Sequence, residues 1–219
     1  MSESLFDAVL WDFGGVITSS PFESFNRYEA ERGLPHDYIR TVNSHNPNSN
    51  AWAMFERSDI SREQFCDRFE QESAQHGHAV PGADVLSLLE GGVREDMVDA
   101  LANIKTRYRI ACLTNNVKSG NGPGMNSNPE RAKRVAEVME MFEFVLQSSE
   151  AGVRKPEPRF FEIACERLNI SPNRAVYLDD LGINLKPARA MGMQTIKVLN
   201  PTQALDELEG ILGHSVRND

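Results

Sequence analysis

Hydrophobic and polar positions follow one another along the chain in blocks that favour a sheet covered by helices. Five short apolar runs are typical of buried strands. They span Ala8–Trp11, Ile110–Leu113, Phe144–Leu146, Ala175–Leu178 and Thr195–Val198. Between the later runs, apolar residues recur at spacings of three and four, which predicts helices. Because strands that alternate with helices imply crossover connections, we expect an α/β fold: a Rossmann-like, mainly parallel five-stranded sheet with helices on both faces.

The segment 17–93 breaks this alternation, since it contains no apolar run typical of a strand. Pro21 directly follows Ser20, a pairing typical of the start of a helix. We therefore predict a helical cap domain at 17–93, inserted after the first strand. Residues 1–16 and 94–219 are then expected to form the α/β core domain.

Composition narrows the class of protein. The chain has 219 residues, 40% of them hydrophobic, which is enough to bury a core. The net charge of −9 argues against binding to nucleic acid or to anionic membrane surfaces. The short acidic start of the chain does not resemble a signal peptide, and no apolar stretch approaches the ~20 residues that span a bilayer. We expect a cytoplasmic protein, a monomer or homodimer, with no membrane or nucleic-acid partner.

Two further features of the sequence predict local properties. Cys66, Cys112 and Cys165 are odd in number and far apart, which predicts three reduced, buried thiols. The stretch 118–128 is rich in Gly, Asn and Ser and is expected to be a mobile loop.

Polar side chains gather just beyond the predicted strands. In an open parallel sheet, ligands bind at the carboxyl ends of the strands, so these residues are expected to meet at one edge. The set comprises Asp12, Thr114, Asn115, Lys155, Asp179, Asp180 and Asn184. Several carboxylates in one crevice repel one another unless a cation lies between them, and Mg²⁺ is the natural choice for oxygen ligands. A lysine and a hydroxyl opposite would hold an anionic group such as phosphate.

Each of these residues also has an ordinary explanation when taken alone. Asp12 suits a turn at a strand end, Thr114 a turn hydroxyl, and Lys155 a solvated surface charge. The pair Asp179 and Asp180 suits the start of a helix, where negative charge is favoured. Their order, each after its own strand, favours the joint interpretation.

The motifs around these residues resemble those of the haloacid dehalogenase-like superfamily of hydrolases. "LWDFGGVI", "LTNN", "GVRKPEPRFF" and "VYLDDLGINL" are similar to its four motifs, in the family's order. The run that includes "YLDDLGINLKPARAMGMQTIKV" is especially similar to the N-terminal phosphatase-like domain of soluble epoxide hydrolase. The resemblance covers about two thirds of the chain and is weak over 17–93, where such proteins carry a variable helical cap.

The resemblance implies Mg²⁺-dependent hydrolysis of a small phosphorylated substrate. Asp12 would be the nucleophile and a metal ligand, and the backbone carbonyl of Gly14 would be a second ligand. Thr114 and Asn115 would orient the phosphoryl group. Lys155 would neutralise the nucleophile and the phosphoryl oxygens.

The fourth motif supplies the remaining roles that the resemblance implies. Asp180 would be a direct metal ligand, with Asp179 beside it and Asn184 in support. A cap for the following helix is an equally good explanation for Asp179.

Gly14 departs from the family pattern, because many phosphatases of the family carry a second Asp there as the general acid and base. Glycine keeps the carbonyl for the metal and lacks the proton donor, whose contribution is typically about 10²–10⁴-fold. Three alternatives remain open from the sequence: a slow or selective phosphatase, a dehalogenase whose halide leaves without a proton, and a phosphate-binding pseudoenzyme.

Overall fold

The computed structural model describes residues 5–89, 91–115 and 129–217. Its centre is one five-stranded sheet of order β3-β2-β1-β4-β5, in which every adjacent pair of strands is parallel. The strands are β1 (Ala8–Trp11), β2 (Arg109–Thr114), β3 (Phe144–Gln147), β4 (Ala175–Asp179) and β5 (Gln194–Lys197). Each contains most or all of one predicted apolar run, so the predicted parallel α/β sheet is confirmed.

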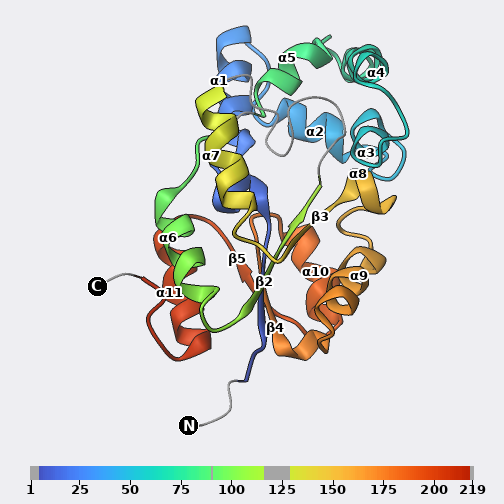
Figure 1. The fold of residues 1–219 in the computed structure, drawn as a ribbon. Helices are drawn as coiled ribbons and strands as arrows, with labels where there is room; N and C mark the ends of the chain where they lie inside the picture. The colour runs from blue at the N-terminus through green and yellow to red at the C-terminus, as the bar shows by residue number, and fades with distance from the viewer. Residues whose placement is uncertain (1–4, 90, 116–128, 218–219) are drawn as a thin grey trace.

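Helices cover both faces of the sheet (Figure 1). Val9 and Trp11 of β1 belong to one hydrophobic cluster, and Ala8 and Leu10 belong to another, because side chains alternate across a strand. The first cluster is completed by α6 (Glu95–Ile104), α7 (Pro129–Met139) and α11 (Pro201–Leu212), and the second by α9 (Pro158–Leu168) and α10 (Gly182–Ala190). Burial on both faces explains why the strands read as continuous apolar runs.

The segment between β1 and α6 forms a helical layer beyond the carboxyl ends of the strands (Figure 1). Its helices, which we call the helical insertion, are α1 (Pro21–Arg32), α2 (Tyr38–Ser44), α3 (Ala51–Glu56), α4 (Arg62–Gln75) and α5 (Gly82–Ser87). The insertion has its own hydrophobic cluster, in which the ring of Phe65 stacks on Phe55 and Phe69. This separate cluster agrees with a cap, while the exact domain bounds stay a prediction.

Two neighbouring stretches of backbone connect the insertion to the sheet. Thr18 and Val93 form an isolated antiparallel bridge, and the Ser19 N–H donates to the Gly92 carbonyl at 2.9 Å. On the other side of the bridge, Arg94 donates its backbone N–H to the Ile17 carbonyl at 2.8 Å. The insertion therefore leaves and rejoins the sheet at one place.

Three smaller expectations have mixed outcomes. The cysteines are unpaired thiols, and Cys112 and Cys165 are buried, but Cys66 is only partly buried, so that part of the prediction is wrong. Cys66 lies in α4 of the insertion, where it packs at the margin of the local cluster. The predicted loop 118–128 lies outside the described residues. Among the helices that are described, none is long and apolar enough to cross a membrane.

The remaining short elements lie close to the strand ends. A π-helical turn, η1 (Phe13–Ile17), follows β1, and α8 (Ser148–Ala151) follows β3. A second short turn, η2 (Pro172–Arg174), leads into β4.

Candidate active site

The parallel register brings the predicted polar residues to one edge of the sheet. Asp12 comes directly after β1, and its backbone N–H donates to the Leu178 carbonyl of β4 at 2.8 Å. Thr114 ends β2 and Asp179 ends β4, the two strands that flank β1. The three side chains thus follow neighbouring strands, as the sequence predicted, and all three are buried.

Lys155 lies at the centre of the group. Its ammonium nitrogen is 2.8 Å from Oδ1 of Asp12 and 2.8 Å from Oδ2 of Asp179, and the side chain is 1% exposed. Burial alone would lower the pKa of Lys155, but the two carboxylates outweigh it and the pKa is raised. The lysine is therefore a fixed positive charge, and the solvated surface charge that its sequence context also allowed is wrong.

The carboxylate of Asp179 is saturated with donors. Besides Lys155, it accepts hydrogen bonds from the Tyr177 hydroxyl, from the backbone N–H of Leu181 at 2.8 Å, and from the Asn184 amide at 3.1 Å to each oxygen. Asp179 is fully buried, so these bonds compensate its charge. Asn184 supports the site through Asp179, and Asp179 itself serves to hold its neighbours.

Asp180 has a different environment. Its Oδ2 accepts a hydrogen bond from the Ser20 hydroxyl at 3.2 Å, and among the described residues it lacks the set of donors that surrounds Asp179. Burial and the adjacent charge of Asp179 raise the pKa of Asp180 to about 6. Its oxygens are therefore much freer than those of Asp179 to bind a ligand.

Asp12 also keeps one oxygen available. Its Oδ1 accepts from the Phe13 N–H at 2.6 Å and binds Lys155, whereas no hydrogen bond from the described residues reaches its Oδ2. Burial raises the pKa of Asp12 well above its ordinary value, and the charges of Asp179 and Asp180 add to this effect, although Lys155 opposes it. The group therefore contains more negative charge than its one ammonium compensates.

This charge imbalance fits a divalent cation. One oxygen from each of Asp12, Asp179 and Asp180 lies within 4.8 Å of the others. Three carboxylates around a single ammonium are best stabilised by a further hard cation, and oxygen ligands favour Mg²⁺. Since Asp179 is already saturated, Asp12 and Asp180 are the better candidates for direct contact.

The two glycines after Asp12 have different reasons to be glycine. Gly15 has a φ of +76°, and a Cβ there would lie 2.2 Å from Oδ2 of Asp180, so both the backbone and the close approach require glycine. Gly14 has ordinary dihedral angles of −69° and 129°, and a Cβ there would meet no atom within 4 Å. The space for a side chain at position 14 is therefore present and unused.

Thr114 and Asn115 differ in how they are used. Among the described residues, none forms a hydrogen bond with the Thr114 hydroxyl, so this group can contact a ligand. The Asn115 side chain is instead held by the backbone of Lys155: its Oδ1 accepts from the N–H at 2.9 Å, and its Nδ2 donates to the carbonyl at 3.0 Å. Asn115 thus fixes the segment that carries the lysine.

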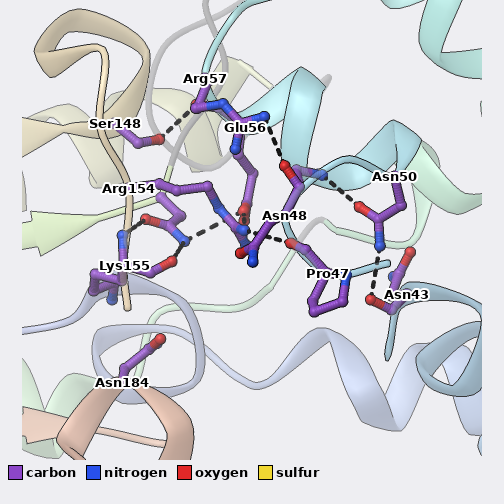
Figure 2. A network of polar contacts seen from close by, with 12 residues as sticks. Asn43, Pro47, Asn48, Asn50, Glu56, Arg57, Ser148, Arg154, Lys155 and Asn184 are labelled. Atoms are coloured by element: carbon purple, nitrogen blue, oxygen red, sulfur yellow. Dashed lines mark hydrogen bonds and ion pairs between the residues drawn. The ribbon is translucent and has the colours of Figure 1, made fainter. Parts of the chain in front are cut away.

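Sequence reasoning missed several residues that surround the site. Tyr177 and Ser20 bind the two aspartates of the fourth motif, and Glu56 and Arg154 form a buried ion pair at 2.5 Å. Burial raises the pKa of Glu56, although Arg154 opposes that effect. Figure 2 shows the Glu56 network. Arg154 and Tyr177 lie within the third and fourth motifs, and Ser20 precedes the predicted helix at Pro21, whereas Glu56 had no sequence signal.

Comparison with known proteins identifies relatives of this chain. A family model described as a haloacid dehalogenase-like hydrolase matches residues 6–192. Acyl-CoA dehydrogenase family member 10 of Mus musculus is 32% identical over 212 residues, which cover 94% of this chain and 19% of that protein. Bifunctional epoxide hydrolase 2 of Mus musculus is 36% identical over 121 residues, which cover 55% of this chain and 21% of that protein. The chain thus matches about a fifth of the length of these curated relatives.

A solved structure shares the fold. A HAD family enzyme from Bacteroides thetaiotaomicron, in complex with magnesium and inorganic phosphate, has a TM-score of 0.57 and 21% sequence identity, with 87% of this chain and 93% of that chain covered.

The pKa of Asp180 predicts how stability depends on pH when no metal is present. Because this pKa is raised from 3.8 to about 6, the carboxyl contributes stability below about pH 4 that is lost as the pH rises through 6. In chelator, the free energy of unfolding of Asp180→Asn should therefore rise relative to that of the wild type between pH 4 and 7, by about 1–3 kcal/mol. Urea unfolding across this pH range measures the gain.

Asp99→Asn is the matched control, since it removes one acid on the exposed side of α6. It should leave the pH dependence as in the wild type. A constant difference between Asp180→Asn and wild type from pH 4 to 7 would contradict the raised pKa.

Proposed function

Because the chain belongs to the haloacid dehalogenase-like hydrolase family, we propose that it is a Mg²⁺-dependent phosphomonoesterase. The substrate class is a small-molecule phosphate, and the reaction passes through a phosphoryl group covalently attached to Asp12. The observation that carries the proposal is the geometry of Asp12, with Oδ1 held by Lys155 at 2.8 Å and Oδ2 accepting no hydrogen bond from the described residues. The magnesium and phosphate in the related Bacteroides thetaiotaomicron structure agree with this substrate class.

The first step transfers the phosphoryl group to the protein. Oδ2 of Asp12 attacks phosphorus, and the bond from phosphorus to the leaving oxygen breaks. Lys155 and the Thr114 hydroxyl stabilise the charge on the phosphoryl oxygens, and Asn115 contributes by fixing the backbone of Lys155. Bound Mg²⁺, held by Asp12, Asp180 and the Gly14 carbonyl, would supply further charge stabilisation.

The second step restores the carboxylate. The oxygen of a water molecule attacks phosphorus, and the bond between phosphorus and Oδ2 of Asp12 breaks. Phosphate then departs, and the free carboxylate remains beside Lys155. Both steps need a proton transfer, first to the leaving oxygen and then from the attacking water. Gly14 has no side chain for either transfer, so we propose that turnover is slow for poor leaving groups.

A second candidate function follows from the same glycine. A protein that binds phosphate without turning over its ester would keep the carboxylates, Lys155 and Thr114 and would not need an acid at position 14. Dehalogenation is less well supported, because halide displacement gives no reason to gather Asp179 and Asp180 around a cation site. We also propose that the helical insertion acts as the cap over the site and that the protein functions in the cytoplasm, as a monomer or homodimer.

A phosphatase screen with the Asp12→Asn variant as the blank tests the function. The wild type should hydrolyse aryl phosphates in Mg²⁺, and chelator should reduce the rate to the level of the variant. Asp12→Asn should lose at least about 10³-fold, because no other carboxylate takes the place of the nucleophile. Absence of activity together with phosphate binding by calorimetry would favour the binding protein. Full activity in chelator would contradict the metal site.

Restoring a carboxylate at position 14 tests the account of the missing acid. Gly14→Asp should raise kcat/KM on alkyl phosphates by about 10²-fold, since a Cβ at this position meets no atom within 4 Å. Aryl phosphates, whose leaving groups need less protonation, should gain less. Steady-state rates on a matched alkyl and aryl pair measure the difference.

The control for this substitution is Gly210→Asp, which adds the same charge at an open position in α11. It should change neither rate. If Gly14→Asp raised both substrates equally, or neither, the missing acid would not limit turnover.

A further inference from the structure

Glu56 belongs to the helical insertion but is buried against the α/β core. It is the last residue of α3, and its side chain is 11% exposed. Its Oε2 lies 2.5 Å from Nη2 of Arg154 and accepts a hydrogen bond from Nδ2 of Asn115 at 3.3 Å. The Ser148 hydroxyl donates to its backbone carbonyl at 2.7 Å. Figure 2 shows Ser148 and Arg154 of the core beside Glu56.

The Asn115 side chain connects Glu56 to the backbone of Lys155. The same Nδ2 that reaches Glu56 also donates to the Lys155 carbonyl at 3.0 Å, and Oδ1 accepts from the Lys155 N–H at 2.9 Å. The Asn115 amide is therefore held between the insertion and the backbone of the lysine that binds Asp12. A shift of Glu56 would remove one of its three anchoring contacts.

Arg154 connects a second point of the insertion to the same segment. Its Nη1 donates to the Pro47 carbonyl at 3.1 Å, and its Nη2 binds Glu56. Since Arg154 directly precedes Lys155, its side chain connects the insertion to the segment that carries the lysine. If the insertion shifted without admitting water, Glu56 and Arg154 would each be a largely buried charge without its partner, which is strongly unfavourable.

We propose that Glu56 is a positioning residue, which holds Lys155 against Asp12 by binding Arg154 and Asn115 when the insertion is docked on the core. The proposal rests on the proposed phosphoryl-transfer function, because it assigns Lys155 a role in that reaction. Docking of the insertion and alignment of the lysine then occur together. Glu56 thereby couples closure over a substrate to completion of the site.

Kinetics of three variants test the coupling: Glu56→Gln, Arg154→Gln and the double variant. Each single variant should lower kcat on an aryl phosphate about 10- to 100-fold with little change in KM, since a misplaced lysine impairs the chemical step. The double variant should be no slower than the slower single one, because the two residues act as one unit. Arg154→Lys keeps the charge and should show a smaller loss.

Hydrogen exchange provides a readout that does not depend on turnover. Amides in the segment 148–155 should exchange faster in Glu56→Gln and Arg154→Gln than in the wild type. Glu143→Gln is the matched control, because it breaks the exposed ion pair between Arg109 and Glu143 and leaves the site untouched. It should alter neither kcat nor exchange in 148–155.

The outcomes separate this proposal from the proposed function. If the wild type lacks phosphatase activity but exchange accelerates in both single variants, the positioning role stands and the reaction does not. If the wild type is active and kcat stays within twofold in both single variants, the positioning role is overturned, whatever the exchange shows. Unchanged exchange in 148–155 in both single variants overturns it as well, whether or not the wild type is active.

Discussion

The structure depends on one buried ammonium placed between two carboxylates. Lys155 lies 2.8 Å from both Asp12 and Asp179, with only 1% of its side chain exposed. Without it, two aspartates at neighbouring strand ends would be buried with like charges and no positive partner, which is strongly unfavourable. With it, the group remains two positive charges short once Asp180 is included. That deficit makes the edge of the sheet a natural place for a divalent cation.

Much of this arrangement could be predicted from the sequence, because two physical rules act together. Strands buried on both faces read as apolar runs, so the strand containing Ala8–Trp11 was visible without a structure. Parallel pairing then collects the residues after each run at one edge, which predicted the proximity of Asp12 and Lys155. The family resemblance assigned the metal contact to Asp180 and left two explanations open for Asp179. What Asp179 binds depends on donors such as Tyr177, whose hydroxyl direction no sequence pattern reveals.

Contacts between the helical insertion and the core could not be predicted. Glu56 and Arg154 are far apart in sequence, and each alone is typical of an exposed charged residue. Their pairing depends on how the insertion packs on the core, and the insertion is the part with the weakest sequence resemblance. The Gly-Gly pair shows the same limit: Gly15 is required by its φ of +76° and its contact with Asp180, whereas Gly14 fills no such need. The sequence showed that Gly14 departs from the family pattern, but it gave no sign of the φ and the close contact that require Gly15.

The helical insertion contacts residues of the candidate site at two points. Through Glu56 it contacts the segment of the lysine, and near its attachment to the sheet Ser20 contacts Asp180. Trapping the covalent intermediate tests the central claim most directly: wild-type protein mixed with Mg²⁺ and excess aryl phosphate, quenched in acid and digested for mass spectrometry. The account predicts one added phosphoryl group on the peptide that contains Asp12, and none in Asp12→Asn. Phosphorylation at another residue, or an equal amount in the variant, would contradict it.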